Sequence, residues 1–383
     1  MAGEDVLAIA QTGTGKTAAF AIPIIHQIDQ RKRSRRSQGI TCIVMVPTHE
    51  LAVQIGEVFA TLSRKTTVKA FALYGGVEQD PQIKKLQDGI DVLIATPGRL
   101  FDLIHQGHIH LNDVETLVLD EADHMLDLGF IKDIRAIKRM LTHQHQTLFF
   151  SATINKEIKN LAYSQVRHSA IRIQISPENH VSKNVSHFVM FVEMDDKRFF
   201  LQRWITDNPE SRIIVFVRTR VRAERVGRAM GRVGIETLTI HGEKNQRDRA
   251  EVMKAFKAGA CRILIATDVS ARGIDIPDVH SVLNYDLPDK AENYVHRVGR
   301  TGRGVNKGMA ISFCSREEKP RLEEIQGFLE KKIDVIKISK KEYAFTMTHP
   351  SDEGSLDTLR EEMEEWEKSN KKKRRKPQRG GKP

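Results

Sequence analysis

Apolar runs rich in β-branched residues alternate, along the first half of the chain, with stretches in which apolar residues recur at helical spacing. The run at residues 6–10 precedes Phe20, Ile24 and Ile28, which are spaced to share one face of a helix. Four further apolar runs that predict strands occupy residues 40–46, 92–95, 116–119 and 147–150. Strands that alternate with helices predict βαβ units around a mostly parallel sheet.

The second half of the chain repeats this alternation after a polar interruption. Residues 174–188 contain several Ser, Pro and Asn residues, which is typical of a linker. A second series of predicted strands follows at residues 213–217, 237–240, 263–266, 282–284 and 309–313. We therefore predict an α/β fold with two doubly wound parallel sheets, one in a domain at residues 1–173 and the other in a domain at residues 189–340.

The C-terminal segment at residues 341–383 differs in composition from both predicted domains. An acidic stretch at residues 356–368 predicts a helix, and residues 371–383 carry eight Lys and Arg residues and no acidic residue. Because the whole chain has a net charge of +11, this tail leaves only +3 for the rest of the chain. We expect the tail to be disordered and to act either as an arm that binds phosphates or as a solubilising segment without a partner.

Other compositional features exclude several classes of protein. No apolar run approaches the roughly 20 residues that a membrane-spanning helix needs, and the N-terminus lacks a charged-then-apolar signal pattern. We therefore expect a cytoplasmic protein with no membrane partner. Cys42, Cys261 and Cys314 are far apart and mostly set within apolar runs, so we expect core residues rather than a zinc site or a disulfide framework.

The segment at residues 10–17, just after the first predicted strand, carries the clearest chemistry. A strand, a glycine loop and a helix form a nucleotide-binding context, because backbone N–H groups of the loop and of the helix N-terminus cradle phosphates. Ala10 stands where the strict P-loop pattern has a glycine, but the later glycines still permit close approach of the backbone. We expect Lys16 at the terminal phosphates and Thr17 at Mg²⁺. The expected nucleotide contacts are Thr12, Gly13, Thr14, Gly15, Lys16 and Thr17.

A second group of candidate residues follows the strand predicted at residues 116–119, where Asp120 and Glu121 come directly after the apolar run. A carboxylate at the end of a strand beside a P-loop is the Walker B arrangement. In it Asp120 holds Mg²⁺, largely through water, and Glu121 orients the attacking water. Acidic residues also end strands at ordinary turns, so this assignment depends on the P-loop upstream.

Residues 296–303 combine three arginines with two glycines in the second predicted domain. Such a segment suits a phosphate clamp, because guanidinium groups bind phosphate oxygens in a fork and glycines let the backbone approach. Arg300 and Arg303 are therefore candidate arginine fingers for the γ-phosphate of ATP, a role worth roughly 10³ to 10⁵ in rate. A solvated basic turn is the alternative interpretation.

Taken together, these motifs resemble those of the DEAD-box RNA helicase family of superfamily 2. The resemblance covers about residues 4 to 315 and implies two RecA-like domains in tandem. It also implies an RNA-stimulated ATPase whose domains close on ATP and RNA and thereby destabilise a short duplex. The matching segments, in chain order, are residues 10–17, 47–54, 75–76, 96–99, 120–123, 151–153, 213–219, 246–249, 266–277 and 296–303.

The resemblance implies roles for residues that composition alone does not identify. Asp275 would lie near the ribose of the nucleotide. Coupling of hydrolysis to contacts between the domains would involve Asp123, Ser151, Thr153 and His296. RNA would be gripped at its phosphates and sugars, without reading of the bases, by two sets of residues. One set comprises Pro47, Thr48, Gly76, Thr96, Gly98 and Arg99, and the other comprises Thr219, Gly242, Gln246, Arg249, Thr267 and Arg272.

Two features depart from the pattern of the family. His49 replaces the arginine that usually follows Pro-Thr, which predicts one weaker phosphate contact. The chain begins just before the first predicted strand, without the upstream Q motif that reads adenine in the family. We therefore expect intact phosphate binding and reduced adenine selection.

Two alternatives to an ATP-dependent RNA helicase stay open on the sequence. The first is an RNA-binding or assembly protein whose ATPase is impaired by loss of the Q motif. The second is a DNA translocase of the same superfamily. The short frame and basic tail resemble bacterial RhlE-type helicases, which implies partners in ribonucleoprotein or ribosomal assembly.

Overall fold

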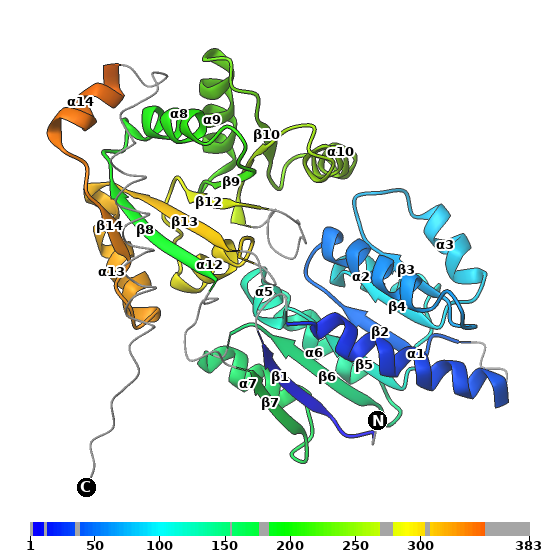
Figure 1. Cartoon of the computed structure of the whole chain (residues 1–383). Coiled ribbons are helices and arrows are strands. Elements are labelled where there is room, and N and C mark those ends of the chain that lie inside the picture. Colours follow the sequence, from blue (N-terminus) through cyan, green and yellow to red (C-terminus); the bar gives the residue numbers. More distant parts are fainter. Residues whose placement is uncertain are drawn as a thin grey trace, which may run out of the picture. The chain divides into compact units, whose positions relative to one another are not determined.

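The computed structural model describes residues 3–10, 14–34, 39–153, 155–175, 184–268, 279–302 and 307–348. Within these ranges the chain forms two compact units, each built on a seven-stranded parallel sheet (Figure 1). The first unit holds strands β1 to β7 and the second holds strands β8 to β14. None of the described helices is long and apolar enough to cross a membrane.

The first unit has the strand order β3-β4-β2-β5-β6-β1-β7, and every neighbouring pair is parallel. Its strands are β1 (Val6–Ala10), β2 (Cys42–Met45), β3 (Ala70–Leu73), β4 (Val92–Ala95), β5 (Thr116–Leu119), β6 (Gln146–Ser151) and β7 (Ile171–Ile175). Its helices are α1 (Lys16–Ser34), α2 (His49–Leu62), α3 (Asp80–Gln87), α4 (Pro97–His105), α5 (Ala122–Asp127), α6 (Ile131–Met140) and α7 (Lys156–Gln165).

Both faces of this sheet are covered by helices. Helices α1 and α2 pack on one face through side chains that include Phe20 and Phe59, whose rings lie 6.2 Å apart. Helices α4, α6 and α7 pack on the other face, where Leu103, Ile137 and Leu161 are fully or almost fully buried. Burial on both faces explains why the central strands read as continuous apolar runs rather than as alternating ones.

The second unit has the strand order β10-β11-β9-β12-β13-β8-β14, again with parallel pairs throughout. Its strands are β8 (Val185–Phe191), β9 (Ile213–Phe216), β10 (Leu238–Ile240), β11 (Ile263–Ala266), β12 (Ser281–Asn284), β13 (Gly308–Cys314) and β14 (Asp334–Ile336). The described helices are α8 (Lys197–Asp207), α9 (Arg220–Arg232), α10 (Gln246–Lys257), α12 (Ala291–Val298), η1 (Arg316–Glu318), α13 (Lys319–Phe328) and α14 (Lys340–Thr348).

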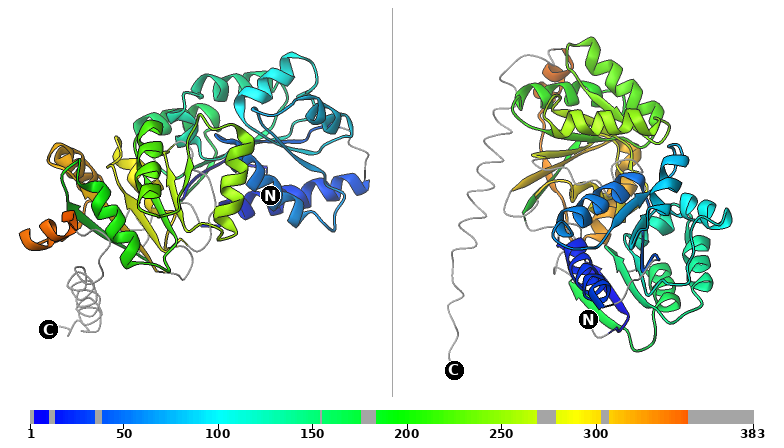
Figure 2. Two further views of the ribbon diagram at one scale, coloured as in Figure 1. Left: turned by 90° about the horizontal axis from the view of Figure 1, so that it is seen from above. Right: turned by 90° about the vertical axis from the view of Figure 1, so that its right-hand side faces the viewer.

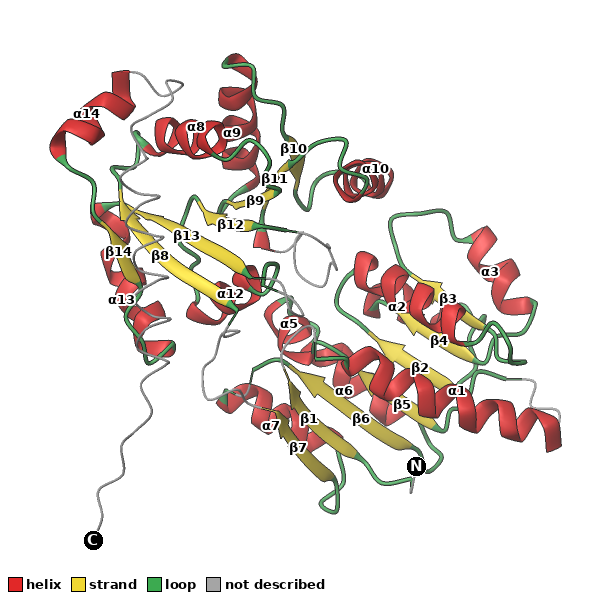
Figure 3. Ribbon diagram, viewed as in Figure 1, coloured by secondary structure: helices red, strands yellow, loops and turns green. Residues whose placement is uncertain are grey.

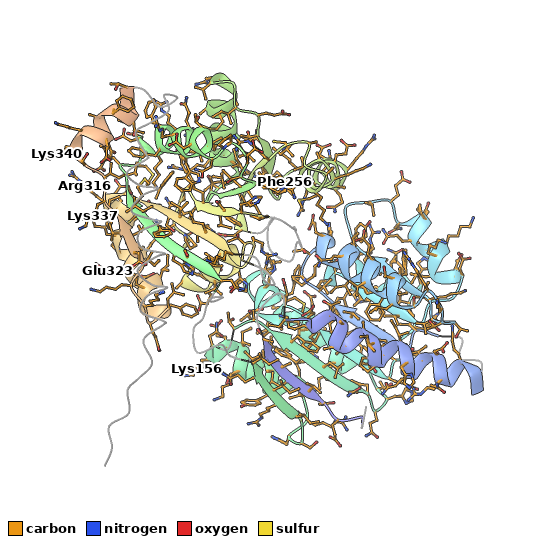
Figure 4. The ribbon with its side chains drawn as sticks, viewed as in Figure 1. Lys156, Phe256, Arg316, Glu323, Lys337 and Lys340 are labelled. Carbon is orange, nitrogen blue, oxygen red and sulfur yellow. The ribbon has the colours of Figure 1, made fainter. Side chains whose placement is uncertain are left out.

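Helices cover both faces of the second sheet as well (Figure 3). Helices α8 and α9 bury Leu201 and Val226 on one face, and α12 and α13 bury Tyr294 and Ile325 on the other. Phe256 of α10 is fully buried (Figure 4). The prediction of two doubly wound α/β sheets is therefore confirmed.

The predicted strands agree with the structure in the centres of the sheets and fail at their margins. All ten predicted apolar runs coincide with strands, with ends that shift by up to two residues. Strands β3, β7, β8 and β14 were not predicted, and two of them overlap the predicted linker at residues 174–188. Residues 174–175 end β7 and residues 185–188 begin β8, while residues 176–183 lie outside the described part of the chain. Of the predicted C-terminal segment, the structure describes residues 341–348 alone, in α14.

The three cysteines are core residues, as the sequence predicts. Cys42, Cys261 and Cys314 are all buried as free thiols. Full burial raises the pKa of the Cys42 thiol well above its usual range, which suits an inert packing residue.

Candidate functional site

Helix α1 begins a few residues after the carboxyl end of β1 in the first sheet. Gly15 adopts φ +83°, a left-handed conformation that glycine adopts without strain, and its carbonyl accepts the hydrogen bond of Ala19 N–H at 3.0 Å. Helix α1 begins at Lys16, so Lys16 and Thr17 lie in the first turn, where backbone N–H groups lack partners within the helix. Predicted contacts Thr12 and Gly13 lie outside the described residues, and Thr14 is exposed.

The amino group of Lys16 is buried and makes no hydrogen bond with the described residues. A buried cation without an acceptor is costly, so such a group indicates a missing anionic partner. Its position in the first turn of a 19-residue helix points to the same ligand, because a helix N-terminus attracts phosphate.

Asp120 and Glu121 follow β5, which lies two strands from β1 with β6 between them. Asp120 is 3% exposed, and its Oδ1 accepts the backbone N–H of Glu121 at 2.9 Å. Burial is the main cause that raises the pKa of Asp120 to about 6; Lys16 lowers this pKa, and the neighbouring carboxylates Glu121 and Asp123 contribute to raising it. The carboxylate thus lies within electrostatic reach of the buried lysine, as a P-loop and a Walker B aspartate would.

Glu121 has an unusual backbone conformation at the junction between β5 and α5. Its φ and ψ are both 49°, which is the left-handed region that side-chain-bearing residues rarely adopt. Its side chain is almost buried, and Oε2 lies 3.5 Å from Nδ1 of His124. Strain of this kind is concentrated at functional sites, which adds a physical reason to the prediction for Glu121.

Asp123 joins α5 to the end of β6. Its Oδ2 accepts three hydrogen bonds, from the backbone N–H groups of Ala152 and Thr153 and from the Thr153 hydroxyl, at 3.0 to 3.2 Å. The hydroxyl of Ser151 in turn donates to the Thr153 carbonyl at 2.8 Å. The structure therefore brings three of the four predicted coupling residues together within the first unit.

The donors near Lys16 suit magnesium bound together with a phosphate ligand. No group of three or more His, Cys, Asp or Glu side chains with metal-site geometry occurs among the described residues. Magnesium retains waters and is commonly bound through one or two carboxylates plus substrate phosphates, which requires no such cage. The hydroxyl of Thr17 and the carboxylate of Asp120 supply hard oxygen donors of the required kind.

The strand order separates the other predicted residues of the first unit from these groups. The strand order places β3, β4 and β2 in one half of the sheet and β5, β6, β1 and β7 in the other half. The predicted RNA contacts follow the first three strands. The predicted nucleotide contacts of this unit follow β1 and β5, and the predicted coupling residues Ser151 and Thr153 lie at the end of β6. Because the carboxyl ends of parallel strands share one edge, both groups lie along the same edge of the sheet.

Two helix N-termini occur among these predicted RNA contacts. Thr48 caps α2, where its hydroxyl accepts the N–H of Leu51 at 3.3 Å, and Thr96 precedes the N-terminal Pro97 of α4. Gly98 lies in the first turn of α4, and a Cβ there would meet no atom within 4 Å. The N-termini of helices, where backbone N–H groups lack partners within the helix, suit backbone phosphates.

The turn at residues 74–77 is held in place by side chains from outside it. Gln82, which is 6% exposed, accepts the N–H of Tyr74 at 3.2 Å and donates to its carbonyl at 3.1 Å. Arg99 donates to the carbonyl of Val77 at 2.9 Å. Gly76 adopts φ +74°, so it requires glycine. The sequence motif identified the glycines and Arg99, but no pattern pointed to Gln82.

In the second unit, Arg297 is the centre of a buried network that sequence reasoning did not single out. Its Nε and Nη2 bind the two carboxylate oxygens of Asp268 at 2.5 and 2.8 Å. Its Nη1 donates to Asn284 Oδ1 at 3.2 Å and to the Asp286 carbonyl at 2.7 Å. Arg297 is 1% exposed, so it ties α12 to the ends of β11 and β12. The sequence feature that could have identified Arg297 is its position between the candidate residues His296 and Arg300 in the 296–303 motif.

The predicted residues around Arg297 are also buried. His296 is 8% exposed and Arg300 is 2% exposed, and Arg300 Nε donates to the His296 carbonyl at 3.2 Å. Arg303, Arg272 and Asp275 lie outside the described residues. The role of Arg300 as a phosphate contact therefore stays a prediction.

The remaining predicted RNA contacts of the second unit follow three neighbouring strands. Thr219 follows β9 and caps α9, where its hydroxyl accepts the N–H of Arg222 at 3.2 Å. Gly242 follows β10, and Thr267 follows β11. Gln246 and Arg249 lie in the first turn of α10. Because the order β10-β11-β9 makes these strands adjacent, the structure brings this set together at one edge.

Lys197 is a further buried residue that no sequence pattern identified. Its ammonium group donates to Glu318 Oε2 at 2.5 Å and to the Tyr285 carbonyl at 2.7 Å, and it is fully buried. Burial lowers the pKa of Lys197, and Glu318 opposes that effect. The pair supports the segment after β12 that also contacts Arg297.

Comparison with known families gives two matches along the chain. Residues 1–161 match the family described as DEAD/DEAH box helicase, and residues 196–305 match the helicase conserved C-terminal domain. Together the two regions cover most of both compact units.

Comparison with individual proteins gives similar relatives. The chain is 39% identical over 336 residues to ATP-dependent RNA helicase RhlB of Shewanella oneidensis, covering 87% of this chain and 76% of RhlB. It is 39% identical over 336 residues to the probable ATP-dependent RNA helicase DDX17 of Mus musculus, covering 86% of this chain and 51% of DDX17. The chain thus spans about half the length of DDX17.

A solved structure is similar in fold. Dbp5 of S. cerevisiae bound to RNA and ADP BeF3 matches with a TM-score of 0.78 and 29% sequence identity. The match covers 91% of this chain and 88% of the Dbp5 chain.

Proposed function

The chain belongs to the DEAD/DEAH box helicase family, and on this premise we propose that it is an ATP-dependent RNA helicase. Its ATP hydrolysis is stimulated by RNA and coupled to local unwinding of short duplexes or to remodelling of ribonucleoproteins. The observation that carries the proposal is the buried amino group of Lys16 in the first turn of α1, which makes no hydrogen bond with the described residues and lies within electrostatic reach of the buried Asp120.

Relatives support both ligands of this proposal. RhlB and DDX17 are named ATP-dependent RNA helicases, and the similar Dbp5 structure is bound to RNA and ADP BeF3. The residue types along the carboxyl edges of the two sheets suit the same pair of ligands. Buried charges follow β1 and β5, whereas helix N-termini and glycine turns follow β2, β3 and β4.

In the proposed reaction, Lys16 binds the terminal phosphates of ATP and Glu121 orients the attacking water. Magnesium, when bound through Thr17 and Asp120, neutralises phosphate charge. Asp123 holds the end of β6 through Ala152 and Thr153, so a displacement at the nucleotide is transmitted to that strand end. Arg300 of the second unit supplies positive charge to the transition state, held by the helix that Arg297 anchors.

A matched set of variants tests this proposal by ATP hydrolysis with and without single-stranded RNA. We expect Lys16→Ala and Glu121→Gln to lower RNA-stimulated hydrolysis by a factor of roughly 10² or more, since each removes a group that acts on the transferred phosphate. Lys65→Ala removes an exposed lysine that lies before the amino end of β3, and it should leave the rate unchanged.

The controls distinguish the rival functions. Hydrolysis by the unaltered chain that does not respond to RNA would contradict the proposal. Negligible hydrolysis together with retained RNA binding would favour an RNA-binding protein with an impaired ATPase. Equal stimulation by single-stranded DNA in competition experiments would favour a DNA translocase.

A further inference from the structure

Helix α9 is the most basic helix that the structure describes in the second unit. Its 13 residues include five arginines at positions 220, 222, 225, 228 and 232, and Glu224 is its single acidic residue. It packs on the sheet through Ala223, Val226 and Met230, which are buried. The arginines therefore occupy the remaining faces of the helix, and their surroundings divide them into two groups.

The arginines of the first turn are engaged within the protein. Arg220 pairs with Glu243, and Arg222 Nε lies 3.0 Å from the buried carboxylate of Asp286. Glu224 is also engaged, because its Oε1 accepts the Thr239 hydroxyl at 2.9 Å and lies 3.0 Å from His241 Nε2. These contacts show that three of the six charged side chains of the helix have partners within the protein.

The other three arginines form an exposed stripe. Arg225, Arg228 and Arg232 are exposed, and none of them makes an ion pair with any residue that the structure describes. The spacings of three, four and seven residues place them on one face of the helix. Arg228 Nε donates to the carbonyl of Glu224 at 3.2 Å, which leaves the charge of its guanidinium uncompensated.

Apolar side chains lie at both ends of the stripe. Val221, which shares the face, is 49% exposed, and Val233 just beyond the helix is 46% exposed. Three uncompensated guanidinium groups without an interleaved carboxylate are an unfavourable arrangement in isolation, because like charges at this spacing repel. In charge, a polyanion is complementary to this stripe.

Another basic surface of the same unit differs from the stripe because it contains acidic residues as well. Around β14, the edge strand of the second sheet, and α13, Arg316, Lys337 and Glu323 supply charges of both signs (Figure 4). Arg316 pairs there with Glu193 at 2.8 Å. Mixed charges of this kind are typical of a solvated surface, in contrast to the stripe on α9.

We propose that Arg225, Arg228 and Arg232 form a phosphate-binding surface that extends the RNA contact of this unit along α9. This inference rests on the proposed function, which supplies RNA as the ligand. Guanidinium groups bind phosphate oxygens bidentately and without regard to base sequence. The stripe thereby lengthens the bound segment of RNA and adds no sequence preference.

Helix α9 begins at the edge that carries the predicted RNA contacts, and the stripe starts about 9 Å along its axis from Thr219. Thr219, at the carboxyl end of β9, caps the helix, and the chain then runs from that edge along the flank of the sheet (Figure 2). From Arg225 to Arg232 the helix rises about 10 Å. That length corresponds to about three phosphates at the axial spacing of roughly 3.4 Å per nucleotide in one strand of a regular duplex.

Affinity for single-stranded RNA of two lengths tests the proposal. The probes are labelled RNAs of about 8 and about 30 nucleotides, measured with the full chain across a range of salt concentrations. We expect Arg228→Gln with Arg232→Gln to raise the Kd for the long RNA roughly fivefold to tenfold and to leave the Kd for the short RNA unchanged. The logarithmic salt dependence for the long RNA should become shallower by about 1.4, since each lost single-strand contact contributes about 0.7.

The chain offers a matched control on a different helix. Arg135 and Arg139 of α6 have the same spacing, are exposed and make no ion pair with the described residues. Their double change to Gln removes the same charge, and it should leave both Kd values and the salt dependence unchanged. Arg228→Lys with Arg232→Lys should retain most of the affinity for long RNA, because lysine still binds phosphate as a point charge.

Four results would overturn the proposal. These are an unchanged Kd for long RNA in the α9 variant, an equal loss in the α6 control, an equal loss for the short RNA, or no retention in the lysine variant. RNA-stimulated ATP hydrolysis on the short RNA separates this proposal from the proposed function. Its absence in the unaltered chain would contradict the helicase assignment, whereas the length-dependent loss of binding reports on α9 alone.

Discussion

Replacement of Arg297 by methionine removes the buried link between α12 and the ends of β11 and β12. The methionine fills part of the same volume, but Asp268 loses both of its guanidinium contacts. Asn284, which is fully buried, and the Asp286 carbonyl lose one donor each. The change therefore leaves a carboxylate and two buried acceptors without the donor that satisfies them.

The expected cost follows from these contacts. Removal of one partner of a buried ion pair destabilises a protein by about 3 to 5 kcal/mol. For a unit of this size, about 1 kcal/mol corresponds to roughly 2 to 4 °C, so the unfolding transition of the second unit should fall by about 10 °C. Arg297→Lys keeps the positive charge but loses the bidentate geometry of the guanidinium group. It should therefore destabilise the second unit much less than the methionine variant does.

Calorimetry of the full chain measures this effect, since the transition of the first unit serves as an internal reference. Asp268→Asn completes a double-mutant cycle with Arg297→Met, and we expect a coupling energy above about 1 kcal/mol between the two sites. A loss below about 1 kcal/mol for Arg297→Met, or additive effects in the cycle, would refute the view that this arginine ties the helix to the sheet.

Two further predictions concern stability. Gly302→Ala should destabilise the second unit by roughly 2 to 4 kcal/mol, because its φ is +66° and a Cβ would overlap Val185 Cγ2. Gly107→Ala serves as the control, because Gly107 also has a positive φ, +77°, but a Cβ there would meet no atom within 4 Å. Thermal unfolding should show that it destabilises its unit by only about 1 kcal/mol. Equal losses of stability for the two variants would contradict the steric argument. Burial lowers the pKa of His187 from 6.5 to about 4, and Lys331 acts in the same direction. Because the unfolded chain gains a proton near pH 6.5 that the native state resists, the free energy of unfolding should fall by about 3 kcal/mol between pH 6.5 and 4. Denaturant titrations of His187→Gln should show a smaller fall over this range, and an identical pH profile would show that another group is responsible.

Strands in the sheet centres were predictable because they are buried on both faces. Residues 92–95 and 263–266 are uninterrupted apolar runs, residues 116–119 are apolar after a β-branched threonine, and each range is a strand over its whole length. The strands that the sequence did not reveal lie at or next to sheet edges. Strand β7 alternates isoleucine with polar residues and is exposed at all five positions, so its composition matches the neighbouring linker. Strand β14 has only three residues, too few for a periodic signal.

The candidate site was predictable where a motif fixes residues at short spacing. Residues 120–123 and 151–153 were identified separately, and the hydrogen bonds from Ala152 and Thr153 to Asp123 now join them. Contacts between distant residues carry no such signal. The pairing of Lys197 with Glu318 spans 121 residues, and the bonds from Gln82 to Tyr74 depend on a turn whose shape only the structure shows.

The left-handed backbone at Glu121 lowers stability at a residue that is proposed to act in hydrolysis. The conformation costs a side-chain-bearing residue about 1 to 2 kcal/mol that glycine does not incur. Selection for thermal stability alone would therefore replace Glu121 with glycine and raise the free energy of unfolding. The proposed role of Glu121 in orienting the attacking water gives a reason for a carboxylate at this costly position. A laboratory-evolved, heat-resistant variant that keeps glutamate at this position would have to gain its stability elsewhere in the fold.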